Sequence, residues 1–346
     1  MAEGSAAASV VRRMMELAVT RGADRRALAE RAAIDPAVLE DHDERVPLER
    51  YKAVIRAGQQ LAGDPALALH YAEAVNLSEV SVVGLLGYAS ETMADAFVQL
   101  QRFSKLVVEV DTGMAENRFE MAVDARGLWL VDNRSNPNDF HELTETAFGQ
   151  MVTGTRRFGD TPFVLEVEVT HDDPGYRAEY ERILGAPVRF GAERNAMRID
   201  PAWPEHRVAV QPRYVFGILN QHAEAMLRRL ESEKTARGRV ESLLMPILHK
   251  GEVGIDSIAA KLGCSRQTLF RRLKAEDSTF EKVLDELRHK LAVQYLAGGK
   301  VSVNETAYLV GFSDPAAFSR AFKRWTGFSP REARGARVVE AEGNER

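Results

Sequence analysis

Cysteine is almost absent from this 346-residue chain, which contains only Cys264. A single cysteine excludes an internal disulfide framework and a zinc site built from several thiolates. The eight histidines include no pair at i, i+4 spacing, and His141, His171 and His222 are scattered along the sequence. Glycine-rich phosphate loops of the Walker type and G-x-S-x-G turns are also missing. We therefore expect no metal, no cofactor and no catalytic nucleophile.

Long apolar runs are missing too, since no stretch approaches the roughly 20 residues of a membrane helix. The first apolar segment contains Arg12 and Arg13 and follows Glu3, which is unlike a secretory signal. We expect a cytoplasmic protein that makes no membrane contact. Hydrophobic residues make up 45% of the chain, which is ample for a core, and the length predicts more than one domain.

Charge is distributed unevenly behind an overall net charge of −5. Residues 234–337 contain 19 Lys and Arg against 11 Asp and Glu, a net charge of +8, so the rest of the chain has a net charge of −13. Such asymmetry indicates a basic module joined to an acidic one, and nucleic acid is the first candidate partner for the basic module.

Hydrophobic periodicity predicts two domains of different class. Residues 10–230 combine helical stripes with short alternating strands, such as FVLEVEVT at 163–170, which predicts an α+β domain. Residues 240–335 show helical patterns interrupted by glycines, which predicts an all-α domain. We expect a disordered tail at 1–9, a charged linker at 231–239 and a second tail at 336–346.

The all-α domain contains an internal repeat. Residues 255–276 match residues 303–325, with Gly263 aligned to Gly311. Each repeat predicts a short helix, a tight turn that needs glycine, and a second helix capped by Ser265 or Asp314. Two units of this kind in a basic region predict a pair of helix-turn-helix motifs.

The second helix of each unit has an outward face that suits DNA. Arginine pairs with guanine and glutamine with adenine in the major groove, while lysine and arginine further along contact phosphates. The candidate base readers are Arg266, Gln267, Phe270, Arg271, Pro315, Ala316, Ser319 and Arg320. The candidate phosphate contacts are Ser265, Arg272, Lys274, Ser313, Lys323 and Arg324.

The residues at 311–313, 317–325 and 327–330 closely resemble the pattern of the AraC/XylS family of transcription regulators, with Ala333 replacing the usual aromatic residue. The resemblance implies that both recognition helices enter successive major grooves of promoter DNA. The segments ERVPLERY (44–51), GDPALALHYAE (63–73), GLLGYASETMADAF (84–97) and GAPVRFGAERNAMRID (185–200) resemble the non-cupin, arabinose-binding-like effector domain of one subgroup. This implies a small-molecule effector, a homodimer and RNA polymerase as a candidate partner.

Two other functions remain open at this point. The N-terminal domain could be a metabolic enzyme with a helical appendage, or the C-terminal domain could be an adaptor for an acidic protein. Cys264 could be a redox sensor, although a semi-buried turn residue is the simpler interpretation. Six aromatic residues could line an effector pocket, but their spacing favours plain core: Phe97, Phe103, Phe119, Trp129, Phe140 and Phe148.

Overall fold

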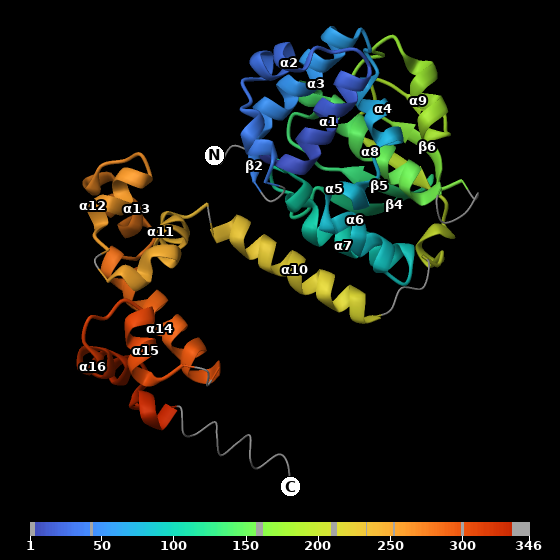
Figure 1. Cartoon of the computed structure of the whole chain (residues 1–346). Helices are drawn as coiled ribbons and strands as arrows, with labels where there is room; N and C mark the ends of the chain where they lie inside the picture. Colours follow the sequence, from blue (N-terminus) through green and yellow to red (C-terminus); the bar gives the residue numbers. More distant parts are fainter. Residues whose placement is uncertain are drawn as a thin grey trace. The chain divides into compact units, whose positions relative to one another are not determined.

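The computed structural model describes residues 4–41, 44–156, 162–208, 213–232, 234–251, 253–298 and 301–333 (Figure 1). The chain divides into two compact units between Leu227 and Arg228, a point that lies inside helix α10 (Arg213–Ser232). The N-terminal unit is α+β and the C-terminal unit is all-α, as the hydrophobic patterns predict.

The N-terminal unit begins with a helical layer over a small sheet. Its order is β1 (Ser5–Ala7), α1 (Ala8–Thr20), α2 (Arg25–Ala32), η1 (Pro36–Leu39), β2 (Arg45–Pro47), α3 (Leu48–Ala62), α4 (Leu67–Ala74), α5 (Leu77–Val80), α6 (Val82–Ala89), α7 (Met93–Val107) and β3 (Val108–Glu109). The three strands form an antiparallel sheet with β1 in the centre.

The prediction of a disordered tail at residues 1–9 is wrong for residues 5–9. Ala6 and Ala8 are fully buried, and β1 pairs with strands on both sides. The small residues of this segment are typical of a disordered tail. The same small side chains allow β1 to pack closely between its two neighbouring strands. Residues 1–3 lie outside the described residues.

A second sheet carries the remainder of this unit. The elements are β4 (Phe119–Asp124), β5 (Gly127–Asp132), η2 (Pro137–Phe140), α8 (Glu142–Thr155), β6 (Val164–Glu168), α9 (Arg177–Leu184), β7 (Val188–Arg189), β8 (Ala196–Ile199) and η4 (Trp203–Glu205). The strand order is β4-β5-β8-β6-β7, and β6–β7 is its parallel pair. Strands β4 and β5 form an antiparallel hairpin, and the strand predicted within residues 163–170 is confirmed as β6.

Two buried arginines share one aspartate beside this sheet. Arg118 Nε donates to Asp132 Oδ1 and Arg134 Nε to Asp132 Oδ2, each at 3.1 Å. The guanidinium groups lower the pKa of Asp132 despite its burial, whereas burial lowers the pKa of Arg134 to about 10. This ionic cluster ties β5 to the chain that leads into α8, because Arg134 also donates to the Phe140 carbonyl oxygen at 3.1 Å.

The C-terminal unit is built from short helices around two small cores. After α10 the elements are α11 (Ala236–Leu244), η5 (Met245–Lys250), α12 (Ile255–Lys261), α13 (Arg266–Ala275), α14 (Phe280–Gly298), α15 (Val303–Leu309) and α16 (Pro315–Thr326). The first core lies under α12–α13 and the second under α15–α16. Helix α14 contributes to both, because Leu291 packs against each core.

The predicted linker at 231–239 is wrong in its second half. Thr235 caps α11, with its hydroxyl accepting from the Gly238 backbone N–H at 2.9 Å, and Ala236 is buried in the first core. The many charged residues in this segment suggested a linker, although its small residues form the buried side of the first turn of α11. The predicted tail at 336–346 lies outside the described residues.

Candidate nucleic-acid interface and effector pocket

Helix α13 presents a polar and cationic face at its N-terminal end. Ser265 caps the helix by accepting from the Thr268 N–H at 3.1 Å. The four predicted base readers on α13 are all exposed: Arg266, Gln267, Phe270 and Arg271. Leu269 and Leu273 are buried on the opposite face, as predicted, so packing fixes the rotation of the helix about its axis.

Arg266 and Phe270 give this face distinct chemistry. Arg266 Nη1 lies 3.3 Å from Asp256 Oδ2 of α12, an exposed ion pair that water screens strongly. Phe270 keeps 53% of its surface exposed. An exposed aromatic ring among guanidinium groups suits contact with a thymine methyl group or a sugar edge.

Helix α16 has the same orientation relative to its own core but fewer hydrogen-bonding groups. The Asp314 carboxylate caps it, accepting from the Ala316 and Ala317 N–H groups at 3.0 Å each. These bonds lower the pKa of Asp314. Ser319 Oγ donates to the Pro315 carbonyl oxygen at 2.9 Å. Its hydroxyl proton is therefore engaged in a hydrogen bond within the helix and is not available to a base.

Arg320 is therefore the strongest candidate base reader of α16. Its side chain is 75% exposed, with Nη2 at 3.9 Å from Asp314 Oδ2. Pro315 is half-buried and Ala316 exposed, and neither offers a side-chain hydrogen bond. Van der Waals contact is what those two positions can provide.

The predicted phosphate contacts are also on the surface. Ser265, Arg272, Lys274, Ser313, Lys323 and Arg324 are all exposed. Arg324 differs from the rest, since its Nη2 donates to Asp285 Oδ2 of α14 at 2.6 Å. This ion pair joins α16 to the central helix, a structural role that the sequence did not reveal.

The two helix-turn-helix units are held together at one turn. Gly311 lies so close to η5 that a Cβ built there would sit 2.2 Å from the Leu248 carbonyl oxygen. Arg288 of α14 donates to the Gly311 carbonyl oxygen at 3.1 Å, and its guanidinium lies 4.8 Å from the centre of the Phe312 ring. These contacts link η5, whose Leu248 packs in the core of the first helix-turn-helix unit, with the turn of the second. Arg288 was missed because nothing in its sequence neighbourhood marks a partner 23 residues away.

Gly263 is the counterpart of Gly311 in the first unit and confirms the predicted turn geometry. Both glycines have positive φ, 62° and 81° respectively. Cys264, next in the chain, is half-buried and packs against the first core, as its simpler interpretation predicted.

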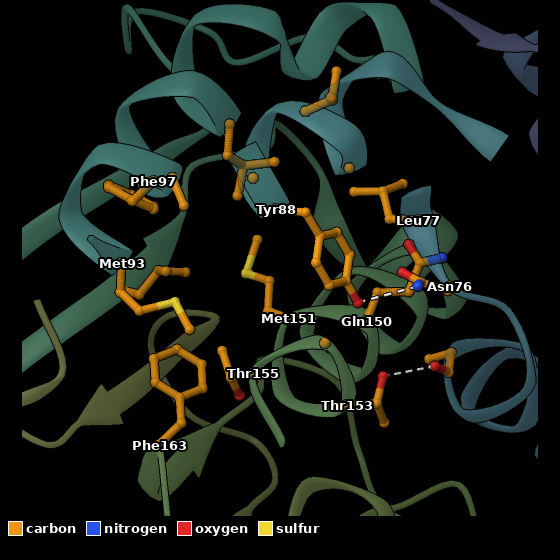
Figure 2. A pocket seen from close by; sticks show the side chains of 18 of the residues that line it. Asn76, Leu77, Tyr88, Met93, Phe97, Gln150, Met151, Thr153, Thr155 and Phe163 are labelled. Carbon is orange, nitrogen blue, oxygen red and sulfur yellow. Dashed lines mark hydrogen bonds between the residues drawn. The ribbon is translucent and has the colours of Figure 1, made fainter. Parts of the chain in front are cut away.

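The N-terminal unit contains a mostly apolar cavity of about 140 Å³ between α6, α7 and α8 (Figure 2). Met93, Phe97 and Phe163 surround one side, and Asn76, Tyr88 and Gln150 surround the other. Of the six aromatic residues considered in the sequence, Phe97 lines this cavity and Phe119 lines a smaller neighbouring cavity of about 100 Å³. The other four are buried core residues, as expected: Phe103, Trp129, Phe140 and Phe148.

Most polar groups of the cavity wall are already bonded within the protein. Asn76 Nδ2 donates to the Tyr88 hydroxyl at 3.0 Å, and Thr153 Oγ1 donates to the Ala72 carbonyl oxygen at 2.8 Å. Glu73 is the charged residue in the wall, and Arg182 binds both of its carboxylate oxygens, at 2.6 and 2.9 Å. The wall therefore offers little to a charged ligand.

A buried polar cluster lies near the other end of α8. Glu145 Oε1 accepts from the Tyr176 hydroxyl at 2.7 Å and the Tyr180 hydroxyl at 2.6 Å. Burial raises the pKa of Glu145 to about 7, although the two hydrogen bonds from the tyrosines lower it. His141 Nε2 lies 3.7 Å from the same oxygen.

His141 and His171 are distant in the sequence but adjacent in the fold. Their ring centres lie 4.7 Å apart, and His171 Nε2 is 3.0 Å from the Tyr180 hydroxyl oxygen. This ring contact places the residue before α8 beside the segment that follows β6. Burial lowers the pKa of both histidines. Within the described ranges, no three His, Cys, Asp or Glu side chains are grouped so as to hold a metal ion.

Comparison with known proteins identifies the domain family of each unit. The model of the arabinose-binding domain of AraC transcription regulators matches residues 22–208, and a helix-turn-helix domain model matches residues 258–336. The chain belongs to the AraC family. It is a DNA-binding transcription regulator with an N-terminal arabinose-binding-like domain, as the resemblance implied, and the matched domains and relatives are those of regulators rather than enzymes.

Known regulators match most of the chain. The ornithine utilization regulator of Pseudomonas aeruginosa is 27% identical over 93% of this chain and 94% of its own length. The regulator VirS of Mycobacterium tuberculosis is 25% identical over 90% of this chain and 91% of its own. The crystal structure of the regulator CdpR from P. aeruginosa aligns with 78% of this chain and 87% of its own, at 20% identity and a TM-score of 0.37. No helix among the residues described here is both long and apolar enough to cross a bilayer.

Proposed function

We propose that this AraC-family regulator reads promoter DNA through the outward faces of α13 and α16, and that its N-terminal unit senses a small molecule. The observation that carries the first part is the exposure of Arg266, Arg271 and Arg320 on two capped helices whose opposite faces are buried. Guanidinium groups near the N-terminal end of a recognition helix pair with guanine in the major groove. The cavity beside α8 is our candidate effector site.

The partners follow from this proposal. The protein acts in the cytoplasm, where its promoter DNA lies. A homodimer joined through N-terminal units would match an operator with two half-sites. RNA polymerase is the further partner if the bound regulator activates transcription.

The decisive experiment selects bound sequences from a random duplex library with the full-length protein. We expect a defined site, and an affinity that falls steeply with salt because phosphate contacts release counterions. The double variant Arg271→Ala, Arg320→Ala should lose at least about 2 kcal/mol of binding free energy at the selected site, since each base contact supplies about 1–3 kcal/mol.

A matched control removes the same charge elsewhere. Arg25 and Arg50 are exposed in the N-terminal unit, and Arg25→Ala, Arg50→Ala should leave DNA binding unchanged. If the recognition-helix variant, still folded, binds the selected site as tightly as this control, the assignment of α13 and α16 as the reading surface is wrong.

A further inference from the structure

The wall of the cavity beside α8 leaves two hydrogen-bond donors without partners. Gln150 Nε2 and Trp203 Nε1 are both buried and have no acceptor among the described residues. Both side chains line the cavity, Gln150 near Asn76 and Tyr88 (Figure 2) and Trp203 against Phe163, with 4.6 Å between ring centres and the rings tilted by 34°. Buried polar groups in native proteins are almost always paired, so an unmet donor in a cavity wall points to a ligand acceptor.

The rest of the wall limits the charge of that ligand. A buried carboxylate needs a cation, and the charged group in this wall is the Glu73 carboxylate, already held by Arg182. Because Glu73 is exposed and its carboxylate is already paired with Arg182, the described wall offers no free cation to an anionic ligand and no free carboxylate to a cationic one. A polyol has several hydroxyl groups that need hydrogen-bond partners. Asn76 and Thr153 are already hydrogen-bonded within the protein, so the wall suits a polyol poorly.

Shape and lining favour an apolar body. The apolar side chains that line it include Met93, Phe97, Leu100, Leu130, Met151 and Phe163. A cavity of about 140 Å³ is similar in size to an engineered apolar cavity of about 150 Å³ that holds benzene. The smaller cavity shares Leu77, Leu100, Gln150 and Met151 with it, so Gln150 lies where the two meet.

We propose that the effector is a neutral, largely apolar molecule with one or two hydrogen-bond acceptors, such as a ketone or an ester, whose carbonyl oxygen accepts from Gln150. This rests on the proposed sensing function of the N-terminal unit and names the ligand class of that site. The apolar body lies against Phe97 and Phe163.

The test measures binding of 2-hexanone to the full-length protein by isothermal titration calorimetry. Hexanoate, which has the same chain length and a negative charge, and L-arabinose, a polyol, are titrated in parallel. We expect saturable binding of 2-hexanone and at least about ten-fold weaker binding of the other two. Absence of 2-hexanone binding, or tighter binding of hexanoate or arabinose, overturns the proposal.

Three variants locate the site. Gln150→Met keeps the side-chain volume and should weaken 2-hexanone binding about ten-fold through loss of one hydrogen bond. Gly87 lines the cavity, and a Cβ there meets no atom within 4 Å, so Gly87→Leu should fill the cavity and abolish binding in a folded protein. Gln99 also has a buried unpaired amide atom, Oε1, but does not line this cavity, so Gln99→Met should bind like the wild type.

The outcomes separate this proposal from the proposed function. Wild-type affinity in Gln150→Met or Gly87→Leu overturns the assigned site, whatever happens with DNA. The same protein preparations are tested for duplex binding. Protein that binds its selected DNA but no ketone refutes only the ligand class, whereas protein that binds ketone but no DNA refutes the role of the recognition helices.

Discussion

The contact between Gly311 and Leu248 is what we expect to fix the spacing of the two helix-turn-helix units, and a pair of alanine substitutions tests it. Gly263 and Gly311 occupy equivalent turns, and both have positive φ. At Gly263 an added Cβ meets nothing within 4 Å, whereas at Gly311 it meets the Leu248 carbonyl oxygen. The two substitutions therefore share a conformational cost and differ in one steric contact.

The structure sets the size of the expected difference. A left-handed conformation costs a non-glycine residue about 1–2 kcal/mol, which is the whole expected effect of Gly263→Ala. Gly311→Ala adds an overlap with backbone atoms of η5 that cannot rotate away, and overpacking of this kind costs about 1–3 kcal/mol more. Relief of the overlap moves the turn away from η5 and strains the bond from Arg288 to the Gly311 carbonyl oxygen.

Hydrogen exchange measured by mass spectrometry gives the opening free energy of each segment in the full-length protein. We expect Gly263→Ala to lower protection mainly in α12 and α13. Gly311→Ala should lower it more strongly in α15 and α16 and should extend the loss to η5. DNA affinity for the selected site should fall further in Gly311→Ala, because the spacing of the two reading helices is no longer held. Equal losses in the two variants, with η5 unaffected by Gly311→Ala, would show that this turn does not couple the units.

Three further predictions concern single side chains. Since burial raises the pKa of Glu145 from 4.5 to about 7, the folded protein retains a proton there that the unfolded chain releases, and native stability falls by about 3 kcal/mol as the pH rises through that range. Glu145→Gln stays neutral and should gain stability relative to the wild type between pH 5 and 8 in denaturant titrations, and a constant difference would contradict the assigned proton. Asp132→Asn leaves two buried guanidinium groups without their carboxylate and should destabilise the N-terminal unit by about 3–5 kcal/mol in the same assay, so a change below about 1 kcal/mol would refute the ionic cluster. Arg272→Ala should weaken DNA binding equally at all sequences and reduce the slope of log affinity against log salt by about 1, while a sequence-dependent loss would indicate base contact instead.

The sequence was most informative where local chemistry decides the structure. The repeat around Gly263 and Gly311, the caps at Ser265 and Asp314, and the i, i+4 pairs of buried residues on α13 and α16 all follow from neighbours within a few positions. Turn conformation, helix capping and amphipathic spacing are local properties, so the recognition helices and their outward faces could be assigned from the sequence.

Local composition was misleading where burial came from distant partners. The small residues at 5–9 and the charged residues at 236–239 have the composition of loose segments, yet strand pairing and core packing hold them in place. A tail and the centre of a sheet can have the same composition, because what distinguishes them is a partner elsewhere in the chain.

By itself, the sequence determined the class of both units and the family, and it predicted which residues face DNA. Only the tertiary structure decided which groups meet across the chain: Glu145 with Tyr180, Arg288 with Gly311, and Gln150 with the cavity wall. The reason is physical. Hydrogen-bond satisfaction, desolvation and cavity shape depend on side chains far apart in sequence, and no local pattern encodes which of them will be left without a partner.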